Sequence, residues 1–289
     1  MTYELYIGDR TFSSWSLRGW LMLEKFGLPY KSTMVGLYAG TMAADLAHLP
    51  GAKTVPVMVT PSGGVLTDSI AMAETLVEEN PDAGLYPKNP EARALARSMI
   101  AEMHGSFGAL RGDCPHNMDH TLVGFQPSPA VTKDVTRISE LWSMARDRFG
   151  KDGPWLFGDY TIADAFYAPI ANRFTTYAIP LGLTAQSYVD AHITDQSNRQ
   201  WRAMGQTVTY DPFPHDFGLA RKLWPLDFIP AKPVDAGPSE NTTCPYFGDP
   251  VTHFMETDGR TYGFCNAFCR DKTVADPGAW PAFMALLKC

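Results

Sequence analysis

Two hydrophobic patterns alternate along the first 87 residues of the chain, one typical of strands and one typical of helices. Alternation over Tyr3–Ile7 predicts a strand, and the apolar positions Leu17, Trp20 and Leu21 predict a helix over 17–26. The same signals predict strands at 30–35, 55–59 and 65–67, and a helix from Asp68 and Ser69 to about Glu79. The order strand, helix, strand and then strand, strand, helix indicates an α/β domain over residues 1–87.

Apolar residues recur at helical spacing through much of 88–225, after a short linker at Pro87–Pro90. The expected helices cover 91–111, 130–149, 165–178 and about 184–206, and an expected loop covers 117–129. Thr161 and Asp164 stand three residues apart after a glycine, which predicts a capping box before the third helix. This region is therefore predicted to be an all-α domain.

Proline-rich sequence separates these domains from the C-terminal part of the chain. Residues 226–240 are expected to form an extended linker, and residues 241–289 a small module. Within the module the Asp258-Gly259 pair predicts a hairpin turn, and a helix is expected to begin near Cys265. A β-hairpin with one helix is a small fold that needs a staple or a partner surface for stability.

Cysteines are concentrated in the same module, where four of the five lie within the last 46 positions. Cys265 and Cys269 are four residues apart, so both sulfurs would lie on one helix face, and the hairpin would bring Cys244 to the same place. Three clustered thiols favour a zinc site, which usually has four protein ligands. His253 is our choice for the fourth ligand, with Cys289 or an exogenous ligand such as water as rivals. The alternative is a hydrophobic hairpin with buried free thiols.

Composition narrows the classes of partner. The 289 residues carry a formal net charge of -7, which argues against nucleic acid or an anionic membrane as the main partner. The sequence begins with no basic segment before an apolar run, and no apolar run approaches the ~20 residues of a membrane span. A cytoplasmic protein is the expectation, and in that reducing compartment clustered cysteines indicate a metal before a disulfide.

A serine-rich turn, Ser13-Ser14-Trp15-Ser16, stands where the first helix is expected to begin. The N–H groups at a helix N-terminus carry a partial positive charge and stabilise an anion, to which a serine hydroxyl can also donate. If that anion is a thiolate, the turn would activate a thiol. Serine is also a preferred N-cap residue, so a purely structural role is the alternative.

Three segments together resemble the cytosolic glutathione S-transferase superfamily. They are the serine turn, Lys53-Thr54-Val55-Pro56-Val57 and Asp68-Ser69-Ile70-Ala71. The resemblance covers about residues 1–225 and implies a thioredoxin-like α/β domain followed by a helical domain. The serine turn is similar to that of zeta-like bacterial members, although Trp15 stands where a cysteine is often found nearby, which counts against maleylacetoacetate isomerase activity.

The same resemblance implies how glutathione would bind. The Val55–Pro56 peptide bond would be cis, and Val55 would pair with the cysteinyl backbone of the tripeptide. Asp68 and Ser69 would hold its γ-glutamyl end, and Lys53 would pair with its glycine carboxylate.

The resemblance also implies a chemistry. A serine hydroxyl at the start of the first helix would hydrogen-bond the glutathione sulfur and favour the thiolate, with Ser14 ranked ahead of Ser13. The thiolate would attack a small electrophilic molecule in a pocket for which His104 and Arg111 are candidates. The alternative for these two residues, which we favour, is a surface ion pair or a satisfied interdomain contact. A homodimer is implied as well. The competing hypothesis is a non-catalytic protein that senses glutathione or metal on the same scaffold.

The cysteine module resembles the TRASH/YHS family of small metal-binding modules. The shared features are twenty residues between Cys244 and Cys265, three between Cys265 and Cys269, and the phrase Gly-Phe-Cys-x-x-x-Cys. This resemblance implies a zinc-finger-like fold that holds a structural zinc ion.

Overall fold

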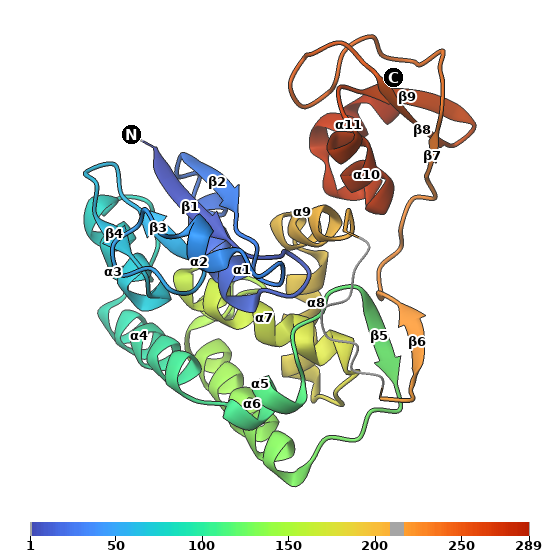
Figure 1. The fold of residues 1–289 in the computed structure, drawn as a ribbon. Helices are drawn as coiled ribbons and strands as arrows, with labels where there is room; N and C mark the ends of the chain where they lie inside the picture. The colour runs from blue at the N-terminus through green and yellow to red at the C-terminus, as the bar shows by residue number, and fades with distance from the viewer. Residues whose placement is uncertain (1, 209–216, 289) are drawn as a thin grey trace. The chain divides into compact units, whose positions relative to one another are not determined.

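The computed structural model describes residues 2–208 and 217–288, and Figure 1 labels its helices and strands. The chain divides into two compact units, which are Met1–Ile193 with His215–Trp224 and Thr194–Pro214 with Pro225–Cys289. The first unit holds the expected α/β domain and most of the expected helical domain. No helix within the described ranges is long and apolar enough to cross a membrane.

A four-stranded sheet in the order β2-β1-β3-β4 organises the first part of this unit. Its strands are β1 (Tyr3–Ile7), β2 (Tyr30–Met34), β3 (Val57–Val59) and β4 (Val65–Leu66). β1 runs parallel to β2 and antiparallel to β3, and β3 runs antiparallel to β4. The accompanying helices are α1 (Ser14–Glu24), the short α2 (Met42–Asp45) and α3 (Ser69–Glu79). This is a thioredoxin-like α/β domain, and the predicted fold class is confirmed.

Helix α1 packs closely on the loop that precedes β3. A Cβ atom on Gly19 would lie only 3.1 Å from the Pro56 ring, so the absence of a side chain lets the helix approach the loop. The Val55–Pro56 peptide bond is cis, as the resemblance implied. Direct packing therefore holds the helix that carries the serine turn against the Val55–Pro56 loop.

Five helices follow in the first unit. They are α4 (Pro90–Gly105), α5 (Gly108–Asp113), α6 (Pro129–Phe149), α7 (Ile162–Thr176) and α8 (Leu183–Thr194). All 15 residues of α7 are buried, which is the pattern of a helix surrounded by other elements. α7 packs on α1 and α4, and the Tyr167 hydroxyl donates to the Met99 carbonyl at 3.1 Å. The central helix thus joins the α/β part to the helical part.

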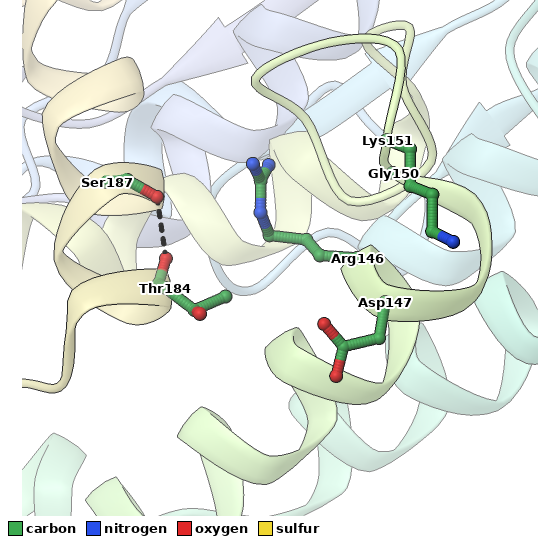
Figure 2. A pocket seen from close by; sticks show the side chains of 6 residues that line it. All are labelled: Arg146, Asp147, Gly150, Lys151, Thr184 and Ser187. Atoms are coloured by element: carbon green, nitrogen blue, oxygen red, sulfur yellow. Dashed lines mark hydrogen bonds between the residues drawn. The ribbon is translucent and has the colours of Figure 1, made fainter.

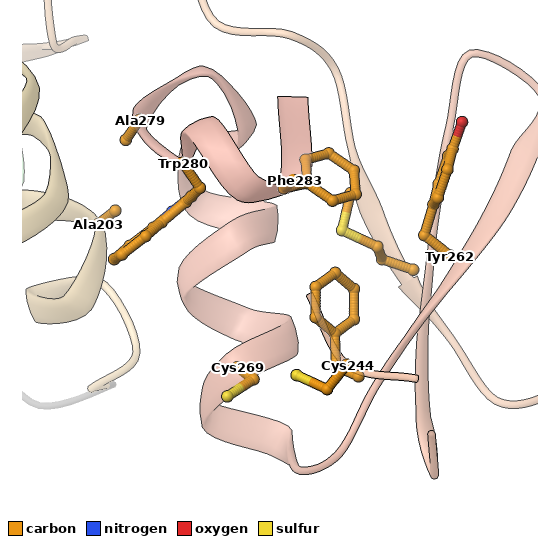
Figure 3. Packing of buried hydrophobic residues seen from close by; sticks show 9 residues of the cluster. Ala203, Cys244, Tyr262, Cys269, Ala279, Trp280 and Phe283 are labelled. Carbon is orange, nitrogen blue, oxygen red and sulfur yellow. The ribbon is translucent and has the colours of Figure 1, made fainter. Parts of the chain in front are cut away.

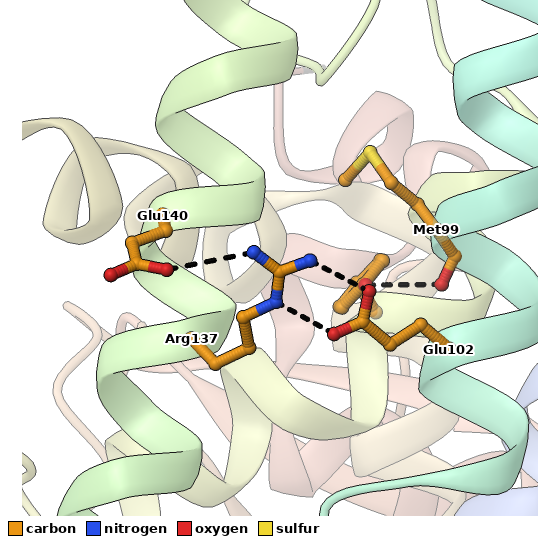
Figure 4. A network of polar contacts seen from close by, with 5 residues as sticks. Met99, Glu102, Arg137 and Glu140 are labelled. Atoms are coloured by element: carbon orange, nitrogen blue, oxygen red, sulfur yellow. Dashed lines mark hydrogen bonds and ion pairs between the residues drawn. The ribbon is translucent and has the colours of Figure 1, made fainter.

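A surface ion pair ties α6 to α4 (Figure 4). Arg137 donates from Nε and Nη2 to the two carboxylate oxygens of Glu102 at 2.7 and 3.0 Å, and Glu140 lies 3.5 Å from Nη1. Because these side chains are partly exposed, their attraction contributes only about 0–1 kcal/mol, and its role is to orient the two helices.

The predicted capping box at the start of α7 is confirmed. The Asp164 carboxylate accepts the Thr161 N–H at 2.8 Å and the Thr161 hydroxyl at 2.9 Å. It also accepts the Leu156 N–H and the Tyr188 hydroxyl, so its buried oxygens are well satisfied. Burial raises the pKa of Asp164, while these donors act in the opposite direction. Thr161 and Asp164 are therefore structural residues.

Two predicted helices are each broken in the structure. The helix expected over 91–111 is divided between α4 and α5, because the backbone of Ser106 is extended and Phe107 takes a left-handed conformation with φ of 60°. The helix expected over about 184–206 is divided between α8 and α9 (Gln196–Gly205), because Asp195 caps a new helix by accepting two backbone N–H groups.

One predicted loop contains a strand. Within 117–129, residues His120–Val123 form β5, which pairs antiparallel with β6 (Ala220–Leu223). The partner strand lies about a hundred positions later in the chain, so no local pattern in the sequence could reveal the pairing.

The second unit contains α9 and the C-terminal module. Its other elements are β7 (Lys232–Val234), β8 (His253–Thr257), β9 (Arg260–Phe264), α10 (Ala267–Ala275), the 3-10 turn Pro277–Ala279 and α11 (Pro281–Leu287). The strands form a sheet in the order β7-β8-β9, with the predicted turn at Asp258-Gly259 between β8 and β9. Lys232–Val234 lies in the segment predicted to be a linker, and its pairing with β8 makes it part of the sheet.

A compact apolar core supports this module (Figure 3). Tyr262, Phe264 and Phe283 are fully buried, and Trp280 packs beside Ala203 of α9. Arg199 of α9 forms a two-pronged ion pair with buried Asp276 at 2.7 and 2.9 Å. The module therefore rests on α9 within one unit.

Candidate functional site

The serine turn divides into two hydroxyls that hold the fold and one that is available. Ser13 caps α1, accepting the Ser16 N–H at 3.4 Å, and its own hydroxyl donates to the Ser16 oxygen at 2.8 Å. That oxygen also accepts the Gly8 N–H at 2.9 Å. The capping role considered for this turn thus belongs to Ser13, with Ser16 supporting it.

Ser14 is the first residue of α1 and has a different environment. Its side chain is 7% exposed, and its oxygen accepts a hydrogen bond from Arg173 Nη2 at 3.4 Å. No acceptor for the Ser14 hydroxyl hydrogen is found among the described residues, so this hydroxyl can donate to a ligand. The structure therefore places an available donor at the N-terminus of a helix beside a guanidinium.

Arginine side chains gather around the same turn. Arg18 is 1% exposed with its guanidinium carbon 4.1 Å from the centre of the Trp15 ring, and the Arg111 guanidinium carbon lies 5.8 Å from that ring. Arg18 Nε and Nη1 are buried without a hydrogen-bond partner in the described part of the chain. Buried donors of this kind are costly unless a partner arrives, so with Arg173 they favour an anionic ligand.

The charges of this cluster act on one another. Burial, together with the positive charges of Arg173 and Arg111, lowers the pKa of Arg18 to about 9. Burial likewise lowers the pKa of Arg173 to about 10. Burial and then Arg173 hold the pKa of His116 well below its usual range, so His116 is neutral. An anion bound here would relieve this mutual repulsion.

Sequence reasoning assigned no role to Arg18, Arg173 or His116. Arg18 did carry a signal, because a charged residue within the apolar run of a helix has to be explained. Arg173 carried none, since the capping box drew attention to the start of α7 and not to its end. Arg111 is brought to the serine turn, as the candidate pocket required.

The other residues expected to bind the tripeptide lie on two loops of the α/β part. Val55 is 8% exposed, and its backbone N–H and C=O form no backbone hydrogen bond with another described residue, so both can pair with an extended ligand. Pro56 packs under α1. Lys53 is exposed on the same loop.

Asp68 and Ser69 stand at the start of α3. Asp68 is its N-cap, accepting the Ile70 and Ala71 N–H groups at 2.7 and 3.4 Å through Oδ1. Its other oxygen lies 3.2 Å from His104 Nε2, and the Ser69 hydroxyl lies 3.4 Å from His104 Nδ1. His104 in turn packs edge-on to the Trp15 ring at 5.1 Å, which links this pair to the serine turn.

A second cluster of reactive side chains lies in the second unit. The sulfurs of Cys244, Cys265 and Cys269 all lie within 4.8 Å of one another, and the last two are 4.0 Å apart. Cys244 sits in a tight turn closed by its N–H bond to Asp249, and Cys269 sits in the first turn of α10, where its N–H bonds to the Asn266 side chain. Three sequence positions predicted to converge are therefore brought together.

The fourth predicted ligand is not part of this cluster. His253 begins β8, and its Nδ1 lies 2.9 Å from the Thr252 hydroxyl. It is not among the described residues whose ligand atoms gather with the three sulfurs. The rival Cys289 lies outside the described residues.

The three thiols differ in their surroundings. Burial acts against the Cys244 thiolate, but N–H groups of Cys265, Tyr246 and Phe247 donate to its sulfur and lower the pKa of this thiol overall. Burial, together with the charge of Cys244, raises the pKa of Cys265, and burial raises the pKa of Cys269 to about 12. Neighbouring thiolates repel, so ionisation of all three requires a cation between them.

A polar pocket elsewhere in the first unit holds none of the predicted site residues (Figure 2). The end of α6 contributes Arg146 and Asp147, and α8 contributes Thr184 and Ser187. Ser187 donates to the Thr184 carbonyl at 2.9 Å, so this surface is satisfied internally.

Comparison with known proteins places this geometry in context. Residues 12–79 match the model of the glutathione S-transferase N-terminal domain. The chain is 31% identical over 179 residues to a probable maleylacetoacetate isomerase of Caenorhabditis elegans, covering 59% of this chain and 79% of that protein.

Solved structures give the same fold. A glutathione transferase homologue from Burkholderia (BGR1), with bound glutathione, matches with a TM-score of 0.53 and 23% identity, covering 72% of this chain and all of that one. A glutathione S-transferase from Rhodospirillum rubrum F11 matches with a TM-score of 0.54 and 22% identity, covering 73% and 94%.

Proposed function

Because this chain belongs to the glutathione S-transferase superfamily, we propose that it is a glutathione transferase in which Ser14 activates the thiol of glutathione. The observation that best supports this proposal is the environment of the Ser14 hydroxyl. It is buried at the N-terminus of α1, and no described residue accepts its hydrogen. Ser13 and Ser16 are already used to cap the helix. Ser14 is therefore the first residue in our assignment, ahead of Ser13.

The mechanism follows from the charge around that hydroxyl. In the proposed complex Val55 pairs with the cysteinyl backbone, Pro56 shapes this loop, and Lys53 pairs with the glycine carboxylate. The sulfur then lies near Ser14, which donates a hydrogen bond to the thiolate, while Arg173 adds positive charge. Both effects favour the thiolate over the thiol and lower its pKa from the ordinary ~8.5. The thiolate forms a bond to carbon of the electrophile, and the leaving group departs with the electron pair.

Purified protein tests this proposal directly. It should be retained on immobilised glutathione, be eluted by free glutathione, and conjugate a generic aryl halide with release of halide. A protein that fails to bind glutathione is not a glutathione transferase, and one that binds without turnover supports the non-catalytic glutathione sensor instead.

Isomerisation of an anionic substrate is a second candidate. The 31% identical relative is a probable maleylacetoacetate isomerase, and the guanidiniums of Arg18, Arg111 and Arg173 favour a substrate with carboxylates. A thiolate that adds reversibly to an activated double bond permits rotation before it leaves again. Turnover of a cis-unsaturated dicarboxylate to its trans isomer without consumption of glutathione separates this activity from conjugation.

The cysteine cluster supports a metal-binding role for the second unit. We propose that Cys244, Cys265 and Cys269 supply three thiolates to a zinc ion, with the module acting as a TRASH/YHS-like fold. N–H groups aimed at the Cys244 sulfur are the outer contacts that orient a metal-bound thiolate. The fourth ligand is open among His253, Cys289 and water, and His253 Nδ1 lies 2.9 Å from the Thr252 hydroxyl.

Elemental analysis of the full chain tests this proposal. About one zinc per chain is expected, with the thiols protected from a thiol reagent until a chelator is added. His253→Ala and Cys289→Ser each keep the metal if water completes the site, and only the variant of a true ligand loses it. Metal-free protein with three freely reacting thiols, or a Cys265–Cys269 disulfide, contradicts the zinc proposal.

A homodimer in the cytoplasm completes the proposal. Family membership supports the homodimer. The clustered free cysteines support a reducing compartment such as the cytoplasm. Size-exclusion chromatography with light scattering gives the mass in solution, and a mass of one chain contradicts the dimer.

A further inference from the structure

His104 makes polar contacts with both residues at the start of α3 that are expected to bind glutathione. It projects from the last turn of α4 and touches two residues at the start of α3, with Nε2 3.2 Å from Asp68 Oδ2 and Nδ1 3.4 Å from the Ser69 oxygen. One imidazole thus contacts both side chains that the resemblance to glutathione transferases assigns to the γ-glutamyl end of glutathione. The imidazole also packs edge-on against the Trp15 ring, with 5.1 Å between the two ring centres.

The donor and acceptor roles of these atoms follow from their chemistry. An ionised carboxylate only accepts, so Nε2 must carry the hydrogen that faces Asp68. In the tautomer that carries its hydrogen on Nε2, Nδ1 is an acceptor and takes the hydroxyl hydrogen of Ser69. Both the Asp68 carboxylate and the Ser69 oxygen are left presenting lone pairs.

Two acceptors side by side recognise a donor. Asp68 Oδ1 accepts two helix N–H groups, whereas Oδ2 has only the His104 donor and keeps a second lone pair for a ligand. The Asp68 side chain is 51% exposed and that of His104 27%, so the pair is reachable from solvent. The α-ammonium group of a γ-glutamyl residue is a cationic donor of the right kind, while the N–H groups at the start of α3 suit its carboxylate.

We propose that His104 is a positioning residue of the glutathione site, which fixes Asp68 and Ser69 as paired acceptors for the α-ammonium group of the tripeptide. This rests on the proposed glutathione-binding function. His104 does not touch the sulfur or the electrophile in this arrangement. It acts through Asp68 and Ser69, and its loss affects binding of glutathione rather than the chemical step.

The test compares His104→Phe with His104→Gln in the full chain. Phe keeps a ring against Trp15 but removes both polar contacts, whereas Gln keeps an N–H donor for Asp68. His104→Phe should raise the KM for glutathione about tenfold, the loss of a hydrogen bond to a charged group, with kcat and the KM for the electrophile within about twofold. His104→Gln should recover most of that loss.

A glutathione analogue without the α-amino group supplies a readout that a structural role would not move. With this analogue, wild type and His104→Phe should have the same KM, because the group that the pair recognises is gone. An equal rise in KM for glutathione and for the analogue, or a fall in kcat together with the unfolding temperature, overturns the proposal. So does an unchanged KM for glutathione in His104→Phe. If the wild type itself does not bind glutathione, the proposed function fails first, and the two failures are thereby distinguished.

Discussion

The serine turn of the first unit and the cysteine cluster of the second share one local arrangement but differ in the groups that surround it. Each gathers small nucleophilic side chains at the start of a helix, α1 in one case and α10 in the other. Around Ser14 the neighbours are guanidinium groups, whose positive charge favours an anionic ligand. Around Cys269 the neighbours are two more thiols, which as thiolates favour a cation.

The difference shows why the same kind of local motif leads to different chemistry. A helix N-terminus contributes a partial positive charge in both places. The charged side chains added by distant segments decide which ligand it binds, and here they come from α7 for the serines and from the turn at Cys244 for the thiols. We therefore expect the first site to depend on hydroxyl donation and the second on deprotonated sulfur.

The largest expected effect is on catalysis. Ser14→Ala should lower kcat/KM for conjugation about 10- to 100-fold, since a hydrogen bond to a charged group contributes about 1.5–3 kcal/mol. The measurement is steady-state conjugation at saturating glutathione. Ser13→Ala is the matched control and should instead lose about 1 kcal/mol of stability as an N-cap while keeping most activity. Equal loss of activity in both variants would remove the distinction between them.

Removal of metal should be the next largest effect. With free zinc about 100-fold above its Kd, binding adds about 2.7 kcal/mol to the folded state, and a chelator should remove that stabilisation. Chemical denaturation of the full chain, followed by tryptophan fluorescence with and without the chelator, measures this difference. Cys265→Ser should match chelated wild type and show no further response to the chelator. A chelator without effect on unfolding would exclude a stabilising metal.

Charge selectivity should change more modestly. Arg111→Gln should lower kcat/KM about tenfold for an electrophile that bears a carboxylate and leave a neutral electrophile of the same reactive group within about twofold. Arg97→Gln, which removes an exposed arginine of α4, is the control and should change neither. The same loss for both electrophiles would show that Arg111 shapes the site without reading charge.

The smallest expected effect is a dependence of stability on pH. Burial, with a contribution from Lys25, lowers the pKa of His192 to about 3, so the native state binds fewer protons than the unfolded state below pH 6.5. Stability is therefore complete above about pH 6.5 and falls as the pH decreases toward 3. Between pH 7.5 and 6 this one group should cost about 0.8 kcal/mol in urea unfolding.

His192→Phe should flatten that dependence while keeping the ring contacts to Trp155 and Tyr188. Part of the slope should remain in the variant, because burial lowers the pKa of His116 in the same direction. A variant with the full wild-type slope would show that His192 is not the group responsible.

Local patterns predicted what local physics determines. The strand Tyr3–Ile7, the cap at Asp68, the turn at Asp258-Gly259 and the capping box at Thr161 were all predicted and are present, because each depends on neighbours in sequence. The convergence of three cysteines followed from the hairpin they flank.

Features that depend on distant contacts were missed. β5 needs β6, the environment of Ser14 needs Arg173, and the role of His104 needs the start of α3. His253 was chosen as a ligand for its chemistry and its proximity in sequence, and its position at the start of β8, with Nδ1 2.9 Å from the Thr252 hydroxyl, could not be predicted from either.

The central claim is that Ser14 converts glutathione into its thiolate, and the ultraviolet absorption of the thiolate in the bound complex measures this directly. Titration of that band should give a pKa for bound glutathione below the ordinary ~8.5 of a thiol in wild type, and a value at least about one unit higher in Ser14→Ala. The same pKa in both proteins, or a bound thiol that titrates like free glutathione, would contradict thiol activation by Ser14.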